Sequence, residues 1–444
     1  MKPLSFFFSL LILAFTSCQE PAPKEEWISL FNGTDLSGWK VNENPGSFRV
    51  EDGVLIAEGP RAHLFYMGED GNASFTNFEL KLEIMTHLHA NSGVYYHTRF
   101  QEEGWPSAGH EVQVNNTHIG GGDYRELKKT GSLYSVKNVY KAFAPDSVWF
   151  TMTIRFEGKH LLVKVNDIVT VDHLISVADS LESGTFALQG HDPGSKVFYR
   201  NIQVKKLPDG GPSGDSMPFS KAFEQMKSLQ SKQFAFIDLH VVPTESFSAN
   251  RAVQNTYREG VNVGILSQAG RPTTENLENL PVFTGLEANN PSTLKDISPE
   301  ELEKYDYVIS DMNIEASQAS ETNLKKFTDT YFAEIMKGLE NPSVDIWATP
   351  TLLPEELKDS YSKIWTDARI RQALTLAKNN HKAIEIDNRL KIPNPEFISL
   401  AKEMGCLFTF SHIAFEPDRN ESDYFLTVID SCKLDYKDLF VPGW

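Results

Sequence analysis

Polar and apolar side chains alternate in two runs between residues 90 and 113. Because successive side chains of a β-strand point to opposite faces, the first run places Tyr95, His97 and Arg99 on one face. The second run places Glu111 and Gln113 on one face in the same way. Polar side chains in register on neighbouring strands predict a polar groove over a sheet, and a solvated outer face is the alternative.

Similar short runs, broken by turn residues, continue from residue 27 to residue 207. They predict further strands at residues 47–50, 78–84, 149–156, 161–165, 184–189 and 197–202. No long helical pattern separates these runs. Short strands at this spacing are typical of an all-β sandwich or jelly roll, which we expect for this part of the chain.

The same alternation adds polar positions to the predicted groove. Gln189 and His191 share a face of a later strand, and Tyr134 ends another short run. If these strands neighbour the first pair, their donors and acceptors suit a hydroxyl-rich ligand. Trp105 and Tyr95 could stack on a sugar ring, although a loop tryptophan often only anchors its loop.

After residue 217 the pattern changes to alternating strands and helices. Strands are expected at residues 234–239, 261–266, 282–286, 307–310, 344–348, 383–387 and 407–411, and helices at 323–339, 354–377 and 395–403. Seven strands with helical crossovers predict a parallel α/β barrel. Sites in such barrels lie at the carboxyl ends of the strands. The polar residues there include Asp238, His240, Glu287 and His412.

Length and charge limit the possible functions. The 444 residues suggest two or three domains, and a Pro-, Gly- and Ser-rich stretch at 208–217 predicts a linker between domains at 27–207 and 218–444. A formal charge of −18 argues against a nucleic-acid partner, which requires a basic surface. Cys406 and Cys432 are too few for a disulfide scaffold, and Cys406 lies in an apolar run that predicts a core position.

The N-terminus has the pattern of an export signal. Lys2 precedes an apolar stretch at residues 4–15 that is too short for a stable membrane span. The small residues before Cys18 resemble a bacterial lipobox, which implies that residues 1–17 are removed and that Cys18 is lipidated. Residues 18–26 would then tether the protein to the cell envelope, with the lipid as its only membrane contact. A conventional signal with an incidental cysteine is the alternative.

Several ordered motifs in the first domain resemble the 3-keto-disaccharide hydrolase domain family, whose members are also described as 3-keto-glycoside lyases and hydratases. The motifs lie at residues 27–39, 50–55, 90–94, 111–113, 130–134, 188–191 and 198–202. The resemblance implies a concanavalin-like jelly roll over residues 27–207. It also implies a carbohydrate substrate with a ketone at C3.

Such a ketone acidifies the C2 proton, so a base can remove it while the glycosidic oxygen leaves from C1. The reaction needs a base, a donor for the enolate oxygen and an acid for the leaving group. His191 or His97 is a candidate base because imidazole titrates near neutral pH, and Glu111 could orient a base, bind a metal or be the base. Arg99 and Gln113 could stabilise the oxyanion. The expected sugar contacts are Tyr95, Gln113, Tyr134, Gln189 and Trp105.

The second domain resembles the polymerase and histidinol phosphatase (PHP) family, whose distorted seven-stranded barrel holds several metal ions. Residues 237–243 match its first motif except that Val242 replaces the second histidine, and residues 285–287 match its glutamate motif. Asn313 and Thr349 replace further histidines. Since metal sites need several converging ligands, the remaining residues could form at most one reduced divalent-metal site, with ligands Asp238, His240, Glu287 and His412.

Together these patterns predict a lipid-anchored envelope protein whose jelly roll binds and cleaves oxidised glycosides, fused to a barrel without full metal chemistry. One alternative is a carbohydrate-binding module without catalysis, favoured by His97 and Asn115, where the resembled family commonly has an arginine and an acidic residue. Another is a metal-dependent phosphoesterase whose activity lies in the barrel and whose jelly roll targets a polysaccharide.

Overall fold

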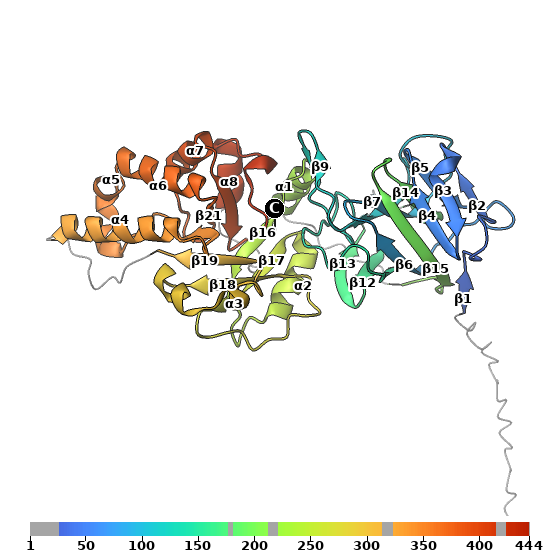
Figure 1. Cartoon of the computed structure of the whole chain (residues 1–444), viewed down its shortest axis with the longest axis horizontal. Coiled ribbons are helices and arrows are strands. Elements are labelled where there is room, and N and C mark those ends of the chain that lie inside the picture. Colours follow the sequence, from blue (N-terminus) through green and yellow to red (C-terminus); the bar gives the residue numbers. More distant parts are fainter. Residues whose placement is uncertain (1–25, 176–180, 212–220, 313–322, 414–422, 444) are drawn as a thin grey trace, which may run out of the picture.

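The computed structural model describes residues 26–175, 181–211, 221–312, 323–413 and 423–443, which form a β-sandwich lobe and an α/β barrel lobe (Figure 1). The predicted export signal and Cys18 lie outside the described residues. So do most of the predicted linker and Asn313.

The first lobe consists of two antiparallel sheets. One has the order β13-β12-β11-β6-β15-β4-β3, with β1 paired to β15, and the other has the order β2-β5-β14-β7-β8. This arrangement confirms the predicted sandwich and fits a jelly roll. The strands are β1 (Trp27–Ser29), β2 (Trp39–Val41), β3 (Phe48–Glu51), β4 (Val54–Glu58), β5 (Ala62–Tyr66), β6 (Phe78–Thr86), β7 (Asn91–Thr98), β8 (His110–Asn115), β11 (Phe150–Glu157), β12 (His160–Val165), β13 (Ile168–Leu174), β14 (Thr185–Gly190) and β15 (Lys196–Lys206), with the hairpin β9 (Gly120–Gly121) and β10 (Tyr124–Arg125) apart from them.

Alternation places the core between the two sheets. On β6, Phe78, Leu80 and Leu82 point inward and are almost fully buried, whereas the residues between them face outward. β7 and β14 are buried along their whole length. Both faces of the smaller sheet are therefore covered, the inner face by the core and the outer face by loop side chains that surround a pocket.

The second lobe is a closed barrel of seven parallel strands, which confirms the predicted strands and their order. The strands are β16 (Ile237–Val241), β17 (Asn262–Gln268), β18 (Phe283–Ala288), β19 (Tyr307–Asp311), β20 (Ile346–Ala348), β21 (Ala383–Asp387) and β22 (Leu407–Ser411). The helices of this lobe are α1 (Lys221–Gln230), α2 (Ala249–Glu259), α3 (Pro299–Leu302), α4 (Leu324–Glu340), α5 (Tyr361–Ile364), α6 (Asp367–Asn379), α7 (Pro395–Glu403) and α8 (Tyr424–Ser431), and its short 3₁₀ turns include η2 (Pro291–Asp296), η5 (Glu355–Ser360) and η6 (Tyr436–Asp438). The 3₁₀ turn η1 (Pro45–Ser47) lies in the first lobe, directly before β3.

The long helix expected at residues 354–377 is instead a 3₁₀ turn and two helices. A new N-cap interrupts it, because the Thr366 side chain accepts a hydrogen bond from the Arg369 amide and starts α6.

Cys406 is buried in the core between barrel and helices, as predicted. None of the described helices has the length and apolar character needed to cross a bilayer.

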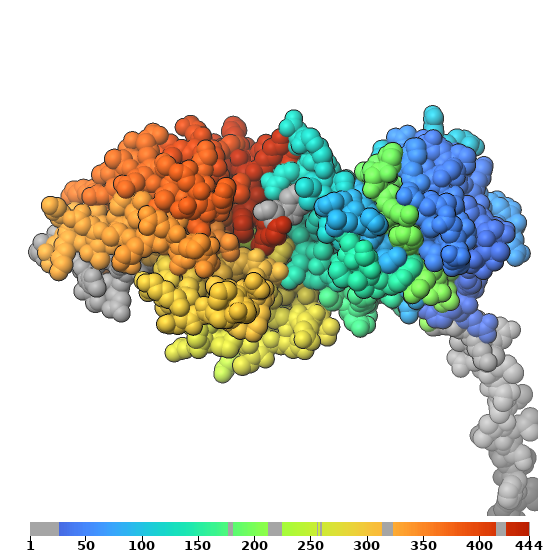
Figure 2. Space-filling view, viewed as in Figure 1, coloured from blue at the N-terminus to red at the C-terminus, as the bar shows by residue number. Residues whose placement is uncertain are grey.

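Residues 116–145, which we call the insert, lie between β8 and β11 in the sequence and between the two lobes in space (Figure 2). Within the insert, Tyr140 donates a hydrogen bond to the Phe234 carbonyl, and Lys137 Nζ donates one to the Val261 carbonyl. The insert therefore belongs to the sandwich by sequence but contacts the barrel directly.

Candidate functional site

The outer face of the smaller sheet carries a pocket of about 310 Å³. Strands β7, β8 and β14 form its floor, and the loop that carries Trp105 and the insert form its walls. The pocket brings together seven of the residues singled out in the sequence. Its lining is Asn91, Tyr95, Trp105, Glu111, Gln113, Tyr124, Glu126, Tyr134, Gln189 and His191.

Glu111 is the central carboxylate of this pocket. Its Oε2 accepts a hydrogen bond from the Tyr95 hydroxyl at 2.8 Å, and its Oε1 accepts one from Gln189 Nε2 at 2.9 Å. Burial raises the pKa of Glu111 to about 7, although both hydrogen bonds oppose that rise. Burial and the adjacent carboxyl raise the pKa of Tyr95, so its hydroxyl stays a donor. Glu111 therefore changes charge near neutral pH.

Two glutamine side chains of the pocket floor have buried amide oxygens. Gln189 donates its amide hydrogen to Glu111, and Gln113 Nε2 donates to Asn91 Oδ1 at 2.5 Å. Their amide orientations are thus fixed by these neighbours. The Oε1 atoms of Gln113 and Gln189 are buried and have no hydrogen-bond partner within the described residues. Since buried polar atoms are normally paired, both oxygens suit hydroxyl groups of a ligand.

His191 and Asp192 form an imidazole–carboxylate pair at the edge of the pocket. His191 Nδ1 lies 2.6 Å from Asp192 Oδ2, which also accepts a hydrogen bond from Ser195 Oγ. Burial alone would raise the pKa of Asp192, but hydrogen bonds led by His191 and Ser195 hold it below its usual value. A carboxylate can only accept, so Nδ1 carries the proton and Nε2 of the neutral ring is the acceptor.

Trp105 provides an aromatic surface at the pocket. Its ring centroid lies 5.5 Å from both the His191 and the His63 ring, and the residue is 46% exposed. Below it, burial lowers the pKa of His63 to about 4, so this imidazole is neutral. A partly exposed aromatic face beside several hydrogen-bonding groups is the usual composition of a sugar site.

Comparison with known proteins agrees with this geometry. Residues 26–205 match the family described as 3-keto-alpha-glucoside-1,2-lyase-like domain. The matched segment coincides with the sandwich lobe. We refer to it below as the lyase-like domain.

Individual relatives match smaller parts of the chain or share low identity. A 3-keto-disaccharide hydrolase from Bacteroides thetaiotaomicron is 28% identical over 100 residues, which are 21% of this chain and only 34% of that relative. A candidate glycosyl hydrolase from Parabacteroides distasonis has a solved structure that is 21% identical, with a TM-score of 0.36, over 41% of this chain and 94% of that chain. A carbohydrate-binding module from Bacillus subtilis is 12% identical, with a TM-score of 0.29, over 38% of this chain and 96% of that chain.

The lyase-like domain does not bring His97 and Arg99 into the pocket, contrary to the alternation expected from sequence. Between Tyr95 and Thr98, β7 has one more residue than the facing part of β14, which is a β-bulge. His97 takes a φ of 50° there and turns into the core, where its ring centroid lies 4.6 Å from that of Phe156. Arg99 follows the end of β7 and is exposed.

Three lining residues were absent from the predicted site. Asn91 lies in the motif at residues 90–94, which predicts no role for its side chain. Tyr124 and Glu126 come from the insert, where the Tyr124 hydroxyl donates to Glu126 Oε2. Polar residues at every second position, Tyr124, Glu126 and Lys128, were the available signal, but the glycines at residues 120–122 interrupt the pattern just before them.

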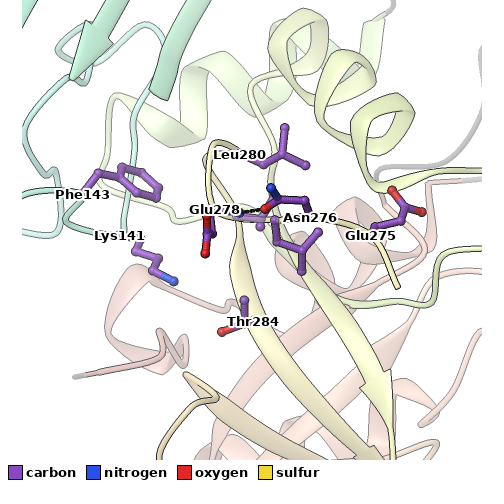
Figure 3. Close-up of a pocket in the computed structure, with 9 residues that line it drawn as sticks. Lys141, Phe143, Glu275, Asn276, Glu278, Leu280 and Thr284 are labelled. Carbon is purple, nitrogen blue, oxygen red and sulfur yellow. Dashed lines mark hydrogen bonds between the residues drawn. The ribbon is translucent and has the colours of Figure 1, made fainter. Parts of the chain in front are cut away.

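A larger hollow of about 520 Å³ lies between the insert and the loop that precedes β18 (Figure 3). Lys141 borders it, but its ammonium already lies 2.6 Å from the Asp306 carboxylate. Phe143, Leu280 and parts of the chain at residues 275–278 form much of the remaining lining. Because this hollow lacks the converging hydrogen-bonding groups of the Glu111 pocket, we assign the function to the smaller pocket.

The barrel has its own polar cluster at the carboxyl ends of its strands. His240 Nδ1 lies 2.6 Å from Glu385 Oε1, and its Nε2 lies 3.4 Å from Glu287 Oε1. Burial opposes a charge on His240, but the two carboxylates outweigh it and raise its pKa well above the usual value. Gln268 and the Thr349 amide donate to the outer oxygens of Glu287 and Glu385. Glu385 was not predicted, because it lies inside an apolar strand.

The four predicted metal ligands do not gather around one point. Asp238 accepts hydrogen bonds from the backbone amides of His240 and Ile413, one on each oxygen. His412 lies beside Asp387 instead, with 3.3 Å between Nδ1 and Oδ2. Within the ranges that the structure describes, no group of three or more His, Cys, Asp or Glu side chains is arranged to hold a metal. The barrel confirms the predicted fold, whereas the PHP resemblance and the single reduced metal site remain predictions from sequence.

Proposed function

We propose that the lyase-like domain cleaves the glycosidic bond of 3-keto-glycosides, such as 3-keto-disaccharides, by elimination or hydrolysis. The observation that carries this proposal is Glu111, a carboxyl with a pKa of about 7 in a pocket that also holds the His191–Asp192 pair. The match to the 3-keto-alpha-glucoside-1,2-lyase-like family and the name of the Bacteroides relative support the same substrate class.

In this proposal Glu111 removes the proton from C2 of the keto sugar. The electron pair of the C2–H bond forms the C1–C2 double bond, and the C1–O bond breaks. A base with a pKa near the working pH combines a sufficient ionised fraction with useful basicity. The Tyr95 and Gln189 hydrogen bonds hold the carboxylate in place at the floor of the pocket.

In its imidazolium form, which carries a proton on each ring nitrogen, His191 delivers the Nε2 proton to the departing glycosidic oxygen. Asp192 fixes the ring through Nδ1, so Nε2 is the atom that exchanges protons with the substrate. In hydrolysis, water then adds across the C1–C2 double bond, with its hydroxyl group on C1 and a proton on C2. Tyr134 supplies a donor hydrogen for the enolate oxygen, since its side chain lines the pocket.

Sugar binding rests on the remaining lining residues. Trp105 stacks on the sugar ring, and the unpartnered Oε1 atoms of Gln113 and Gln189 accept its hydroxyl hydrogens. The pocket volume of about 310 Å³ suits one sugar unit with part of its aglycone.

The direct test is incubation of the purified protein with a 3-keto-glucoside that carries a chromogenic aglycone, with the unoxidised glucoside as the control. We expect aglycone release from the keto compound alone, and loss of release in Glu111→Gln and His191→Ala. Turnover that persists in both variants would reject the assigned site. Saturable binding without release in the wild type would favour the carbohydrate-binding alternative, and neither binding nor release would reject the substrate class.

The envelope location belongs to this proposal and is supported by the sequence pattern around Cys18. We expect the protein to fractionate with membranes when it is expressed with its own N-terminus, and Cys18→Ala to release it. Mass spectrometry of the N-terminal peptide should show a lipidated Cys18. An unmodified Cys18 in the exported protein would contradict lipidation and favour a conventional signal.

A further inference from the structure

The insert forms one wall of the sugar pocket and also closes one end of the barrel. Tyr124, Glu126 and Tyr134 line the pocket. Leu127 and Tyr140 instead belong to the apolar cluster that fills the inside of the barrel. A single segment of about thirty residues is thus part of both lobes.

The two roles meet at three consecutive residues. Glu126 faces the pocket, where its Oε1 lies 3.1 Å from Lys128 Nζ and accepts the Lys128 amide hydrogen. Leu127, between them, is 2% exposed and packs with Leu239, Phe283 and other barrel side chains. Lys128 Nζ also lies 4.6 Å from the centre of the Tyr134 ring. Because side chains alternate along an extended chain, fixing Leu127 fixes the direction of Glu126 and Lys128.

The barrel holds the insert at the amino ends of its strands, opposite the His240 cluster. Tyr140 and Lys137 donate hydrogen bonds to carbonyls just before β16 and β17, and the Asn262 side chain donates to the Asn138 carbonyl at 2.9 Å. Near the end of the chain, the Tyr436 hydroxyl donates to the Asp123 carbonyl at 3.0 Å. This last bond is next to Tyr124, on the pocket side of the insert.

We propose that the barrel is the support of the sugar pocket, with Leu127 and Tyr436 as positioning residues that hold Glu126 and Tyr124 toward the substrate. This inference rests on the proposed function, since it assigns the substrate-binding wall of the same site. Glu111 and the His191–Asp192 pair stand on or next to strands of the sandwich. The barrel therefore affects substrate binding, whereas the sandwich alone positions the reacting groups.

The test uses the full chain with Leu127→Ala and Tyr436→Phe. We expect the KM for a 3-keto-glucoside to rise roughly tenfold in Leu127→Ala and about threefold in Tyr436→Phe, with kcat within about twofold of wild type, because binding alone is weakened. Leu127→Met, which keeps most of the apolar volume, should restore the wild-type KM. Leu374→Ala is the matched control, since Leu374 is equally buried in the barrel lobe but belongs to its outer core.

Amide hydrogen exchange provides a readout that needs no substrate. Exchange at residues 123–128 should rise in Leu127→Ala and Tyr436→Phe but stay at the wild-type rate in Leu374→Ala. Unchanged exchange at these residues in both variants overturns the inference. An increase of the KM in Leu374→Ala as large as that in Leu127→Ala also overturns it. If the wild type neither binds nor cleaves a 3-keto-glucoside while exchange responds as expected, the proposed function fails and the support of the pocket wall stands.

Discussion

Gly93 leaves the space that Glu111 occupies. The two residues lie on the paired strands β7 and β8, and a Cβ atom added to Gly93 would lie 2.2 Å from Glu111 Oε1. The missing side chain on β7 is therefore what lets the carboxyl of Glu111 lie flat over the sheet, within reach of both Tyr95 and Gln189.

We expect Gly93→Ala to displace the Glu111 carboxyl and to reduce kcat by at least about tenfold, which corresponds to about 1.4 kcal/mol of transition-state stabilisation. Steady-state kinetics on a 3-keto-glucoside would measure the loss. Gly46→Ala is the control, because an added Cβ there meets no atom within 4 Å. Equal activity of both variants would show that the position of Glu111 does not matter.

The pKa of Glu111 predicts the pH dependence of catalysis. As the base, Glu111 must be ionised, so kcat/KM should rise with pH through about 7 and fall about tenfold per unit well below it. The raised pKa also means that the protonated carboxyl stabilises the folded state at low pH. This contribution to the free energy of unfolding is fully present below pH 4.5, the ordinary pKa of a glutamate, and is lost as pH rises through about 7. Glutamine has no proton to lose in this range, so the stability of Glu111→Gln should not show this decrease. A flat rate profile from pH 5 to 8 would argue against Glu111 as the base.

Asp192→Asn should reduce kcat by roughly a hundredfold while leaving the pocket intact. An asparagine has no negative charge to stabilise the imidazolium form of His191 that delivers the proton, and its NH₂ group no longer fixes the ring by accepting the Nδ1 proton. Kinetics with a 3-keto-glucoside would measure the loss, and a binding assay should give nearly the wild-type affinity. Asp359→Asn is the control, because Asp359 is exposed on the barrel lobe. Wild-type kcat in Asp192→Asn would mean that the ring orientation is irrelevant to the reaction.

His97→Phe should keep kcat within about twofold of wild type, in contrast to His191→Ala. The bulge turns His97 into the core, where Phe retains the aromatic packing on Phe156 but loses the hydrogen bond to the Thr76 carbonyl. That loss should cost about 1 kcal/mol of folding free energy, measured by urea unfolding. A large loss of activity in a folded His97→Phe protein would restore His97 as a candidate catalytic residue.

His240→Ala should destabilise the barrel by about 3 kcal/mol, because it leaves the buried carboxylates of Glu287 and Glu385 facing each other without a cation. Urea unfolding followed by tryptophan fluorescence would measure the change. Lys325→Ala, at an exposed position on α4 of the same lobe, serves as the control. A variant as stable as wild type would show that the ion pairs of His240 with Glu287 and Glu385 make no net contribution to the free energy of unfolding.

The pattern of residues along the chain was enough to predict the fold class of both lobes and most of the pocket floor. Strand alternation and apolar runs are local properties, so β7, β8 and the seven barrel strands were predictable within a few residues. The same local rule placed Glu111, Gln113 and Gln189 correctly on one side of their sheet, because no irregularity interrupts their strands at those positions.

The other features could not be predicted from the chain, because they depend on contacts between residues far apart in it. The bulge that buries His97 exists only through the pairing of β7 with β14. Glu126 reaches the pocket because Leu127 is buried in a barrel that begins about a hundred residues later. The neutral-range pKa of Glu111 follows from burial that strands and the insert produce together, and a linear pattern contains no measure of burial.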